Sequence, residues 1–409
     1  MKEKPRTFTS PFSQGGFMLP QEEMLEVKRK SSRLNIGIPK ETSFQERRVS
    51  LVPDAVMVLV NNGHDVIVET GAGVNSNYQD KDYSEAGAQI AYGPEQVYKS
   101  NIVLKVAPPT FDEIEMMQPK QTLISALQLT VQQKNFFNHL ISKKITGLAF
   151  DFIKDRSGIY PVVRSMSEIA GNTSILIAAE HLSTTNQGKG MMLGGISGVP
   201  PTEVVIIGAG TVGEFAARAS VGLGASVKVF DNSLYRLRRI QNDLGMRLFT
   251  SIIQPRELEQ ALSHADVVIG ALRSKEGRTP IVVTEEMVSN MKHGAVVVDI
   301  SIDQGGCFET SQVTNHANPT FRKYGVTHYC VPNIASRVPQ TASMALSNIF
   351  TPILMDMGEK GGIDSFLRES AGVRNGVYIY NGILTHKYIG ETYNIPYKDL
   401  DLLIAATQF

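Results

Sequence analysis

The sequence predicts an α/β protein with two doubly wound domains, and three observations support this fold class. From Leu34 onward, short apolar strands alternate with helical segments, which is typical of mostly parallel sheets covered by helices on both faces. The 409 residues are enough for two domains of ordinary size. In the middle of the chain, a glycine-rich strand–turn–helix opens a second series of strands.

The first series of elements forms one α/β domain. We expect its strands at residues 35–39, 65–68, 101–106, 122–125 and 147–150, and its helices at 55–62, 94–98 and 132–143. Residues 1–33 differ in composition, with a loop at 7–16 and a short helix at 19–30. Proline opens this helix, acids fill its first turn and bases its last, which suits the helix dipole. We expect this segment to be an appended arm.

The second series begins after a helix at 167–183. We expect its strands at 204–207, 226–230, 266–269, 295–300 and 329–331, and its helices at 211–223, 257–264 and 285–292. A long helix at 341–357 then leaves the second domain, and the last fifty or so residues are too few for a third domain. The predicted division is therefore an arm (1–33), a first domain (34–165 plus 341–409) and a second domain (166–340).

The glycine-rich turn predicts a dinucleotide site. It has the form G-x-G-x-x-G and consists of Gly208, Ala209, Gly210, Thr211, Val212 and Gly213. Gly208 permits the tight turn, Gly210 lets the backbone approach a pyrophosphate, and Gly213 lets the helix pack on the strand. Asp231 ends the next strand, where a carboxylate accepts both ribose hydroxyls of an adenosine. The alternative is a structural turn without a ligand.

Asp231 also indicates which cofactor to expect. A 2′-phosphate beside this carboxylate meets like charge, so NAD is favoured over NADP. Arg236, Arg238 and Arg239 follow closely and leave NADP open as an alternative.

Composition excludes several other classes. Lys plus Arg balances Asp plus Glu at 40 each, which gives no reason to expect nucleic acid or an anionic membrane as a partner. No apolar stretch approaches the roughly 18 residues that span a bilayer. Two cysteines and eight scattered histidines show no disulfide framework and no metal-ligand spacing. We expect a cytoplasmic protein without a metal.

Three residues outside the turn suggest chemistry. Asp303 lies in the loop after strand 295–300, where it suits a proton acceptor or a partner for a developing cation; the alternative is a turn aspartate bonded to its own backbone. Arg48 follows the first strand and suits a two-pronged bond to a carboxylate, the alternative being a solvated surface arginine. Lys105 ends an apolar strand and either neutralises a bound acid or extends its stem to water.

Four segments together resemble the alanine dehydrogenase family, which shares its fold with the NAD-binding subunit of proton-pumping transhydrogenases. The segments are residues 36–42, 166–171, 208–213 and 298–309. The resemblance implies a Rossmann NAD-binding domain inserted in a flavodoxin-like, formate-dehydrogenase-type substrate domain. It also implies a homo-oligomer, a hexamer or a dimer, that oxidatively deaminates L-alanine to pyruvate and ammonium.

The resemblance assigns roles by position. Arg48 matches the arginine that binds the substrate carboxylate, and Asp303 matches the catalytic aspartate. The positions that match cofactor contacts are Ser167, Asp231, Arg236, Leu272, Ile300, Ser301, Ile302, Asp303, Val331, Asn333 and Ile334.

Two positions depart from the family pattern. Ala107 stands where family dehydrogenases carry a substrate-binding lysine, and Gln128 stands where they carry a catalytic histidine. Glutamine forms hydrogen bonds but exchanges no proton at neutral pH, and we expect Gln128 at the reaction centre and Lys105 as a partial replacement for the missing amine. The departures keep two alternatives open: a transhydrogenase-like NAD(H)-binding subunit, or an NAD(H)-binding homologue with weak catalysis or none.

Overall fold

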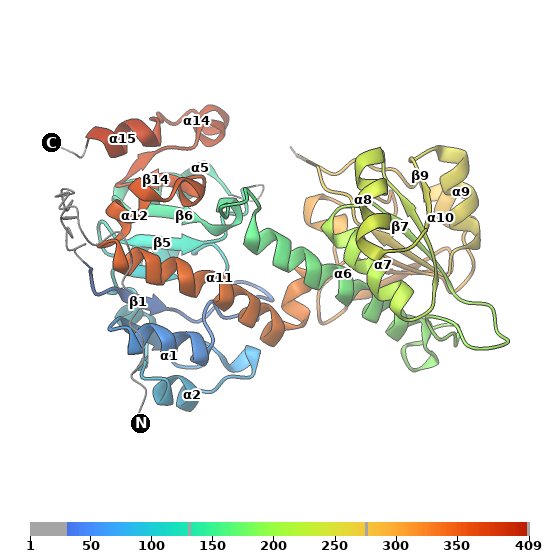
Figure 1. The fold of residues 1–409 in the computed structure, drawn as a ribbon, viewed down its shortest axis with the longest axis horizontal. Coiled ribbons are helices and arrows are strands. Elements are labelled where there is room, and N and C mark those ends of the chain that lie inside the picture. Colours follow the sequence, from blue (N-terminus) through green and yellow to red (C-terminus); the bar gives the residue numbers. More distant parts are fainter. Residues whose placement is uncertain (1–30, 130–131, 275–276, 407–409) are drawn as a thin grey trace, which may run out of the picture.

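The computed structural model describes residues 31–129, 132–274 and 277–406, arranged as two α/β domains joined by two long helices (Figure 1). The predicted helix at 19–30 and most of the predicted arm lie outside these residues.

The first domain is built on an eight-stranded sheet with the order β15-β14-β6-β5-β4-β1-β2-β3. Its strands are β1 (Asn35–Ile38), β2 (Asp65–Glu69), β3 (Gln89–Ala91), β4 (Ile102–Leu104), β5 (Thr122–Ser125), β6 (Thr146–Ala149), β14 (Val377–Tyr380) and β15 (Ile383–Leu384). The strands from β1 to β6 pair in parallel, and β14 pairs antiparallel with β6 and with the edge strand β15. Strands β2, β1, β4, β5 and β6 follow the doubly wound 2-1-3-4-5 pattern of flavodoxin-like sheets, with β3 added beside β2.

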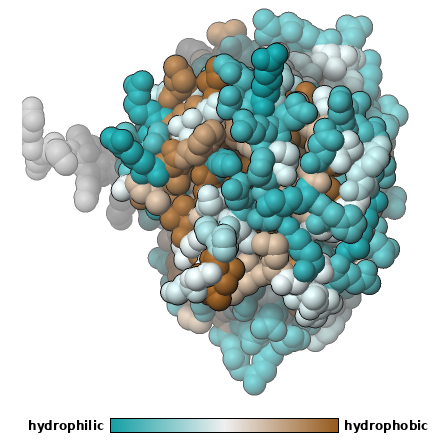
Figure 2. Space-filling model, turned by 90° about the vertical axis from the view of Figure 1, so that its right-hand side faces the viewer, coloured by the Kyte–Doolittle hydropathy of each residue, from teal (hydrophilic) through white to brown (hydrophobic). Residues whose placement is uncertain are grey.

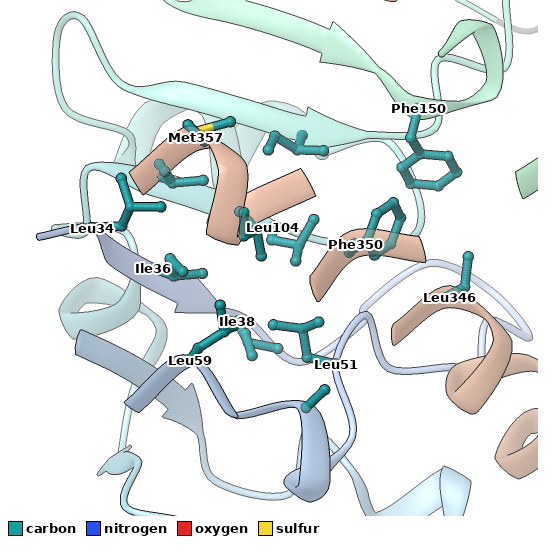
Figure 3. Packing of buried hydrophobic residues seen from close by; sticks show 14 of the residues in the cluster. Leu34, Ile36, Ile38, Leu51, Leu59, Leu104, Phe150, Leu346, Phe350 and Met357 are labelled. Carbon is teal, nitrogen blue, oxygen red and sulfur yellow. The ribbon is translucent and has the colours of Figure 1, made fainter. Parts of the chain in front are cut away.

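Helices cover both faces of this sheet because successive side chains of each strand point to opposite sides. The helices are α1 (Pro53–Asn61), α2 (Asp80–Glu85), α3 (Pro94–Val97), α4 (Phe111–Met116), α5 (Lys134–Ser142), α12 (Ile363–Glu369), α13 (Ala371–Arg374), α14 (Lys387–Tyr393) and α15 (Leu400–Ala406). On one face, Ile36 and Ile38 share a core cluster with Leu59 of α1, and the long helix from Pro339 adds Phe350, which lies beside Phe150 (Figure 3). On the other face, the core is formed with α4 and α5.

The second domain is built on a seven-stranded sheet with the order β12-β13-β11-β10-β7-β8-β9. Its strands are β7 (Glu203–Ile207), β8 (Ser226–Phe230), β9 (Phe249–Ser251), β10 (Val267–Gly270), β11 (Val296–Asp299), β12 (Thr320–Lys323) and β13 (Val326–Tyr329), and its helices are α7 (Thr211–Gly222), α8 (Leu234–Leu244), α9 (Pro255–His264) and α10 (Glu285–Ser289). From β9 to β13 this is the 3-2-1-4-5-6 order of a Rossmann sheet, with β12 as an antiparallel edge strand. The predicted fold class is confirmed.

Two long helices connect the domains, α6 (Pro161–Leu182) and α11 (Pro339–Glu359). They contact each other, and both run between the two sheets (Figure 1). The residues after α11 return to the first domain, where β14 and β15 extend the sheet. The division at 165/166 and 340/341 remains our proposal; the first boundary falls inside α6 and the second lies just after the start of α11.

Most predicted strands coincide with observed ones, but the one expected at 329–331 is wrong, because β13 ends at Tyr329. Thr327 and His328 hid this strand from a search for apolar runs. His328 is fully buried, and Thr310 forms a hydrogen bond with its ring at 2.9 Å. Helix α6 also begins six residues before the predicted start, at a proline that suits the first helical position.

The far end of the second domain is hydrophilic over most of its surface, and hydrophobic side chains gather toward one side (Figure 2). Among the residues described, no helix is both long and apolar enough to cross a membrane.

Candidate functional site

The site lies where the two sheets present their topological switch points. In the second domain the strand order reverses between β7 and β10, and in the first domain between β1 and β4. Ligands of open α/β sheets bind beyond the carboxyl ends of the strands at such points. The glycine-rich turn follows β7, whereas the loops that carry Arg48 and Lys105 follow β1 and β4.

The three glycines of the turn differ in what they do. Gly208 has φ +114°, a conformation that side chains with a Cβ rarely adopt, and a Cβ on Gly213 would lie 1.8 Å from the carbonyl oxygen of Gly208. A Cβ on Gly210, in contrast, would meet nothing within 4 Å. Helix α7 begins at Thr211, and its first intrahelical bond runs from the Glu214 N–H to the Gly210 carbonyl at 2.9 Å. Open space beside Gly210 therefore adjoins the free N–H end of a helix, which fits a pyrophosphate.

Asp231 shapes the same turn. Its carboxylate accepts hydrogen bonds from the N–H groups of Ala209 and Ser233, both at 2.7 Å, and Arg236 approaches to 3.6 Å. The side chain is buried, yet two backbone bonds leave acceptor positions on a carboxylate that takes about four. The residue thus fits a sugar hydroxyl while it holds the turn in place.

Asp299 organises the loop that carries Asp303. The buried Asp299 carboxylate accepts hydrogen bonds from the N–H groups of Ser301 and Cys307, both at 3.0 Å, and from the Ser311 hydroxyl at 2.6 Å. These bonds fold η4 (Ile300–Gln304), a short 3-10 helix that places Asp303 at the domain junction. Asp303 was predicted as a site residue, whereas Asp299 was not singled out.

Asp303 is linked to the first domain through Asn333. Its Oδ1 accepts a hydrogen bond from the Asn333 N–H at 2.9 Å, and the Asn333 side chain donates to Glu46 Oε2 at 2.9 Å. Asn333 adopts φ +54°, a left-handed conformation that asparagine adopts more readily than most residues. Although Asp303 is exposed at the junction, the surrounding protein desolvates its carboxyl and raises its pKa; the Asn333 N–H and the charges of Arg48 and Arg273 oppose this shift.

Arg48 is not the solvated surface arginine that the sequence left as an alternative, because its side chain is only 10% exposed. Its Nε and Nη2 donate to the two oxygens of Glu46 at 2.7 and 2.6 Å, and Nη1 lies 3.3 Å from the Met166 sulfur. Burial opposes the charge on Arg48, but Glu46 outweighs it and the pKa of Arg48 is raised. Since a guanidinium has five N–H groups, the Nη1/Nη2 edge keeps donors for a second carboxylate.

Lys105 lies in a buried ionic cluster rather than reaching water. Its Nζ is 2.7 Å from Glu113 and 3.7 Å from Glu41, and the side chain is fully buried. The alternative in which the lysine stem extends to solvent is therefore wrong. Ala107 lies beside this cluster, and its N–H donates to Glu41 at 3.3 Å. Burial of Glu41 raises the pKa of its carboxyl to about 7, against the opposing charge of Lys105.

Gln128 follows β5 with φ +47° and lies next to an acid that we did not predict, Asp151. The Leu127 N–H donates to Asp151 Oδ2 at 3.2 Å. A further unpredicted residue is Arg273, which follows β10 and whose charge acts on both Asp151 and Asp303. Both residues could have been found in the sequence, because each is a charged residue within three positions of the end of an apolar strand.

The other predicted cofactor residues follow the carboxyl ends of strands in the second sheet, except Ser167, which lies on α6. Ser167 is part of α6, and its hydroxyl donates to the Val163 carbonyl at 2.7 Å. Leu272 follows β10, and Val331 and Ile334 follow β13. Ile300, Ser301 and Ile302 belong to η4. A hollow of about 730 Å³, lined by residues of α13, α14 and α15, shares no residue with this site.

Comparisons with known proteins agree with this geometry. Residues 37–170 match the family model "Alanine dehydrogenase/PNT, N-terminal domain", and residues 174–387 match "Alanine dehydrogenase/PNT, C-terminal domain". The chain is 38% identical over 371 residues to an alanine dehydrogenase of Mycolicibacterium smegmatis, covering 90% of this chain and all of the relative. An alanine dehydrogenase of Staphylococcus epidermidis is 38% identical over 369 residues, which cover 90% of this chain and 99% of the relative.

Solved structures show the same relationship. An L-alanine dehydrogenase superposes with a TM-score of 0.83 at 36% identity, covering 88% of this chain and 99% of the other. A transhydrogenase from Sinorhizobium meliloti superposes with a TM-score of 0.74 at 23% identity, covering 86% and 99%, which shows a common fold. Fold and relatives place the chain among two-domain α/β oxidoreductases. Within this class, it belongs to the alanine dehydrogenase/PNT family.

The glycine-rich turn gives a prediction with a matched control in the same helix. Gly213→Ala forces α7 away from β7, so we expect a loss of about 1–3 kcal/mol in stability and at least about tenfold weaker NADH binding. Gly222→Ala has open space for its Cβ and should be neutral or stabilise the protein by up to about 1 kcal/mol. Thermal unfolding and NADH titration measure both. Equal NADH affinity of the two variants would contradict this account of the turn.

Glu41 gives a prediction for the pH dependence of stability. Its pKa of about 7 lies above the usual value of 4.5, so the folded state binds more protons in this window and stability falls as pH rises through it. Glu41→Gln should therefore gain about 1–3 kcal/mol relative to the wild type between pH 4.5 and 8. Denaturant unfolding across this range tests the effect, with Glu85→Gln at an exposed position of α2 as the control. Parallel pH profiles of wild type and Glu41→Gln would refute it.

Proposed function

We propose that the chain is an NAD-dependent amino-acid dehydrogenase that converts L-alanine, or a closely related amino acid, to pyruvate or the corresponding oxo acid and ammonium. The observation that carries this proposal is the chain of hydrogen bonds across the junction, in which Glu46 binds both Arg48 and the Asn333 side chain while the Asn333 N–H binds Asp303. The names of the relatives at 38% identity support the choice of substrate. We extend the proposal to a homo-oligomer in the cytoplasm.

Each residue then has a role. Glu46 fixes Arg48 by two hydrogen bonds, so that the remaining Nη1/Nη2 edge binds the substrate carboxylate. NAD, when bound, would accept the hydride. Asp303 stabilises the positive charge that develops as the amine becomes an iminium group, and its raised pKa suits proton exchange. Overall, amino acid, NAD⁺ and water give oxo acid, ammonium, NADH and one proton.

The cofactor-binding residues are proposed on the same basis. Gly208 to Gly213 and the first turn of α7 would hold the pyrophosphate, and Asp231 would hold the adenosine ribose, which favours NAD over NADP. Leu272, the η4 residues and the segment 331–334 lie at the carboxyl ends of β10, β11 and β13. They would enclose the nicotinamide half.

Two observations favour a second candidate, an NAD(H)-binding protein without turnover of its own. Ala107 offers only a buried methyl group and an N–H already bound to Glu41. Gln128 cannot supply a proton at neutral pH. A transhydrogenase-like subunit that passes hydride to a partner chain would share both features.

Turnover separates these candidates. The purified protein is mixed with NAD and a panel of amino acids, or with NADH, ammonium and oxo acids, while the absorbance of NADH is followed. We expect turnover without a partner protein. NADH binding without turnover of any amino acid would reject the dehydrogenase.

Asp303→Asn tests the assigned catalytic role. The amide still accepts the Asn333 hydrogen bond but loses the charge, so we expect turnover to fall by about 10²- to 10⁴-fold, with NADH affinity within about threefold of wild type. Asp112→Asn, at an exposed position of α4, is the control and should retain full activity. Weaker NADH binding by Asp303→Asn with unchanged kcat would show that the aspartate serves the cofactor and not the reaction.

A further inference from the structure

Asp151 lies beside the residue that replaces the expected histidine. It belongs to η2 (Phe150–Phe152), directly after β6, and Gln128 follows the neighbouring parallel strand β5. Ser125 and Ala149 are paired at the carboxyl ends of these strands. The Leu127 N–H donates to Asp151 Oδ2 at 3.2 Å, and the Gln128 backbone N–H also acts on this carboxylate. The two side chains therefore leave the sheet at the same edge.

The second oxygen of Asp151 has no partner. Oδ1 is buried without a hydrogen bond to any described residue, and so is the hydroxyl of Tyr378 on β14, which lies within electrostatic range of this carboxylate. Buried polar atoms are almost always paired with protein, water or ligand. A buried oxygen without a partner, on Asp151 as on Tyr378, therefore points to a water molecule or a ligand group bound to it.

The second domain supplies a positive charge that acts on the Asp151 carboxylate. Arg273 follows β10 at the switch point of the second sheet, and its exposed guanidinium acts on Asp151 as well as on Asp303. The charge of Arg273 acts to lower the pKa of Asp151, and the charge of Asp151 in turn adds to the burial that raises the pKa of Tyr378. Burial raises the pKa of Asp151, and Arg273 opposes this shift. Such a carboxyl changes its protonation closer to neutral pH than an exposed aspartate does.

We propose that Asp151 exchanges the substrate proton that Gln128 cannot, so that a carboxyl one strand away replaces the missing imidazole. This inference rests on the proposed dehydrogenase function. When water adds to the iminium carbon, a C–O bond forms and the C=N electron pair moves to nitrogen. The water proton passes to Asp151 Oδ1. Asp151 then returns this proton to the nitrogen. As the C–N bond breaks, the hydroxyl oxygen forms the C=O bond of the oxo acid, and the hydroxyl proton passes through Asp151 to the departing ammonia, which leaves as ammonium.

A merely structural Asp151 would behave differently. In that case the carboxylate only holds the turn at Leu127, a role that an asparagine side-chain oxygen also fulfils. Asp151→Asn therefore preserves the hydrogen bond seen in the structure and removes proton exchange alone. Gln128→His, placed in the Asp151→Asn background, restores a proton-exchanging group at the adjacent position.

The experiment measures amino-acid turnover against pH, NADH affinity and thermal stability for the wild type, Asp151→Asn, Asp151→Asn with Gln128→His, and the surface control Asp112→Asn. We expect Asp151→Asn to lower kcat by about 10²- to 10⁴-fold, with NADH affinity and stability unchanged. The acid limb of the kcat profile set by Asp151 should disappear, leaving that of Asp303. Adding Gln128→His should recover at least about tenfold, and Asp112→Asn should match the wild type.

The outcomes are distinguishable. A wild type that turns over no amino acid rejects the proposed function and this inference with it. An active wild type whose rate and pH profile survive Asp151→Asn rejects the inference alone. Loss of activity without recovery by histidine, accompanied by lower stability, would assign Asp151 a structural role and also overturn the inference.

Discussion

The geometry of the junction depends on the carboxylate of Glu46. It is buried, binds Arg48 through both oxygens and accepts a hydrogen bond from Asn333, a residue of the other domain. Burial alone would raise the pKa of Glu46, but Arg48 outweighs it and the net shift is downward, which keeps the group ionised. Breaking a buried pair of this kind typically costs about 3–5 kcal/mol, because one charge is left unpaired. Arg48, Glu46 and Asn333 therefore act as one unit.

The loop that carries this pair is fixed by hydroxyl groups of other segments. Ser343 and Ser347, one turn apart on α11, accept hydrogen bonds from the N–H groups of Val49 and Val52, both at 2.9 Å. Ser336 of η5 (Ile334–Arg337) accepts from the Arg47 N–H at 3.0 Å. A buried loop without regular structure must place its backbone polar groups somewhere. Here the helix that crosses between domains satisfies them, so the position of Arg48 depends on α11.

The sequence was sufficient to predict the features that depend on a local pattern of residues. Apolar runs located most strands, and the spacing of Gly208, Gly210 and Gly213 located the turn because each glycine meets a local steric demand. The states of Arg48 and Lys105 were not predictable in this way. Their partners Glu46 and Glu113 are near in sequence, but only the folded loops show that both pairs are buried. Asp151 and Arg273 were missed because they act on each other across the two domains, and the sequence alone does not show which residues of the two domains come close.

Two electrostatic interactions at the junction link a carboxylate of one domain to a cation of the other. Asp303 of the second domain is acted on by Arg48 of the first, whereas Asp151 of the first is acted on by Arg273 of the second. Burial raises the pKa of both aspartates, whereas backbone N–H groups and a cation from the other domain favour the charged forms. By contrast, Ala107 and Gln128 carry no charge. The charged groups are therefore the ones that a neutral substitution would leave without a counterpart across the junction, whereas Ala107 and Gln128 add no charge to either switch point.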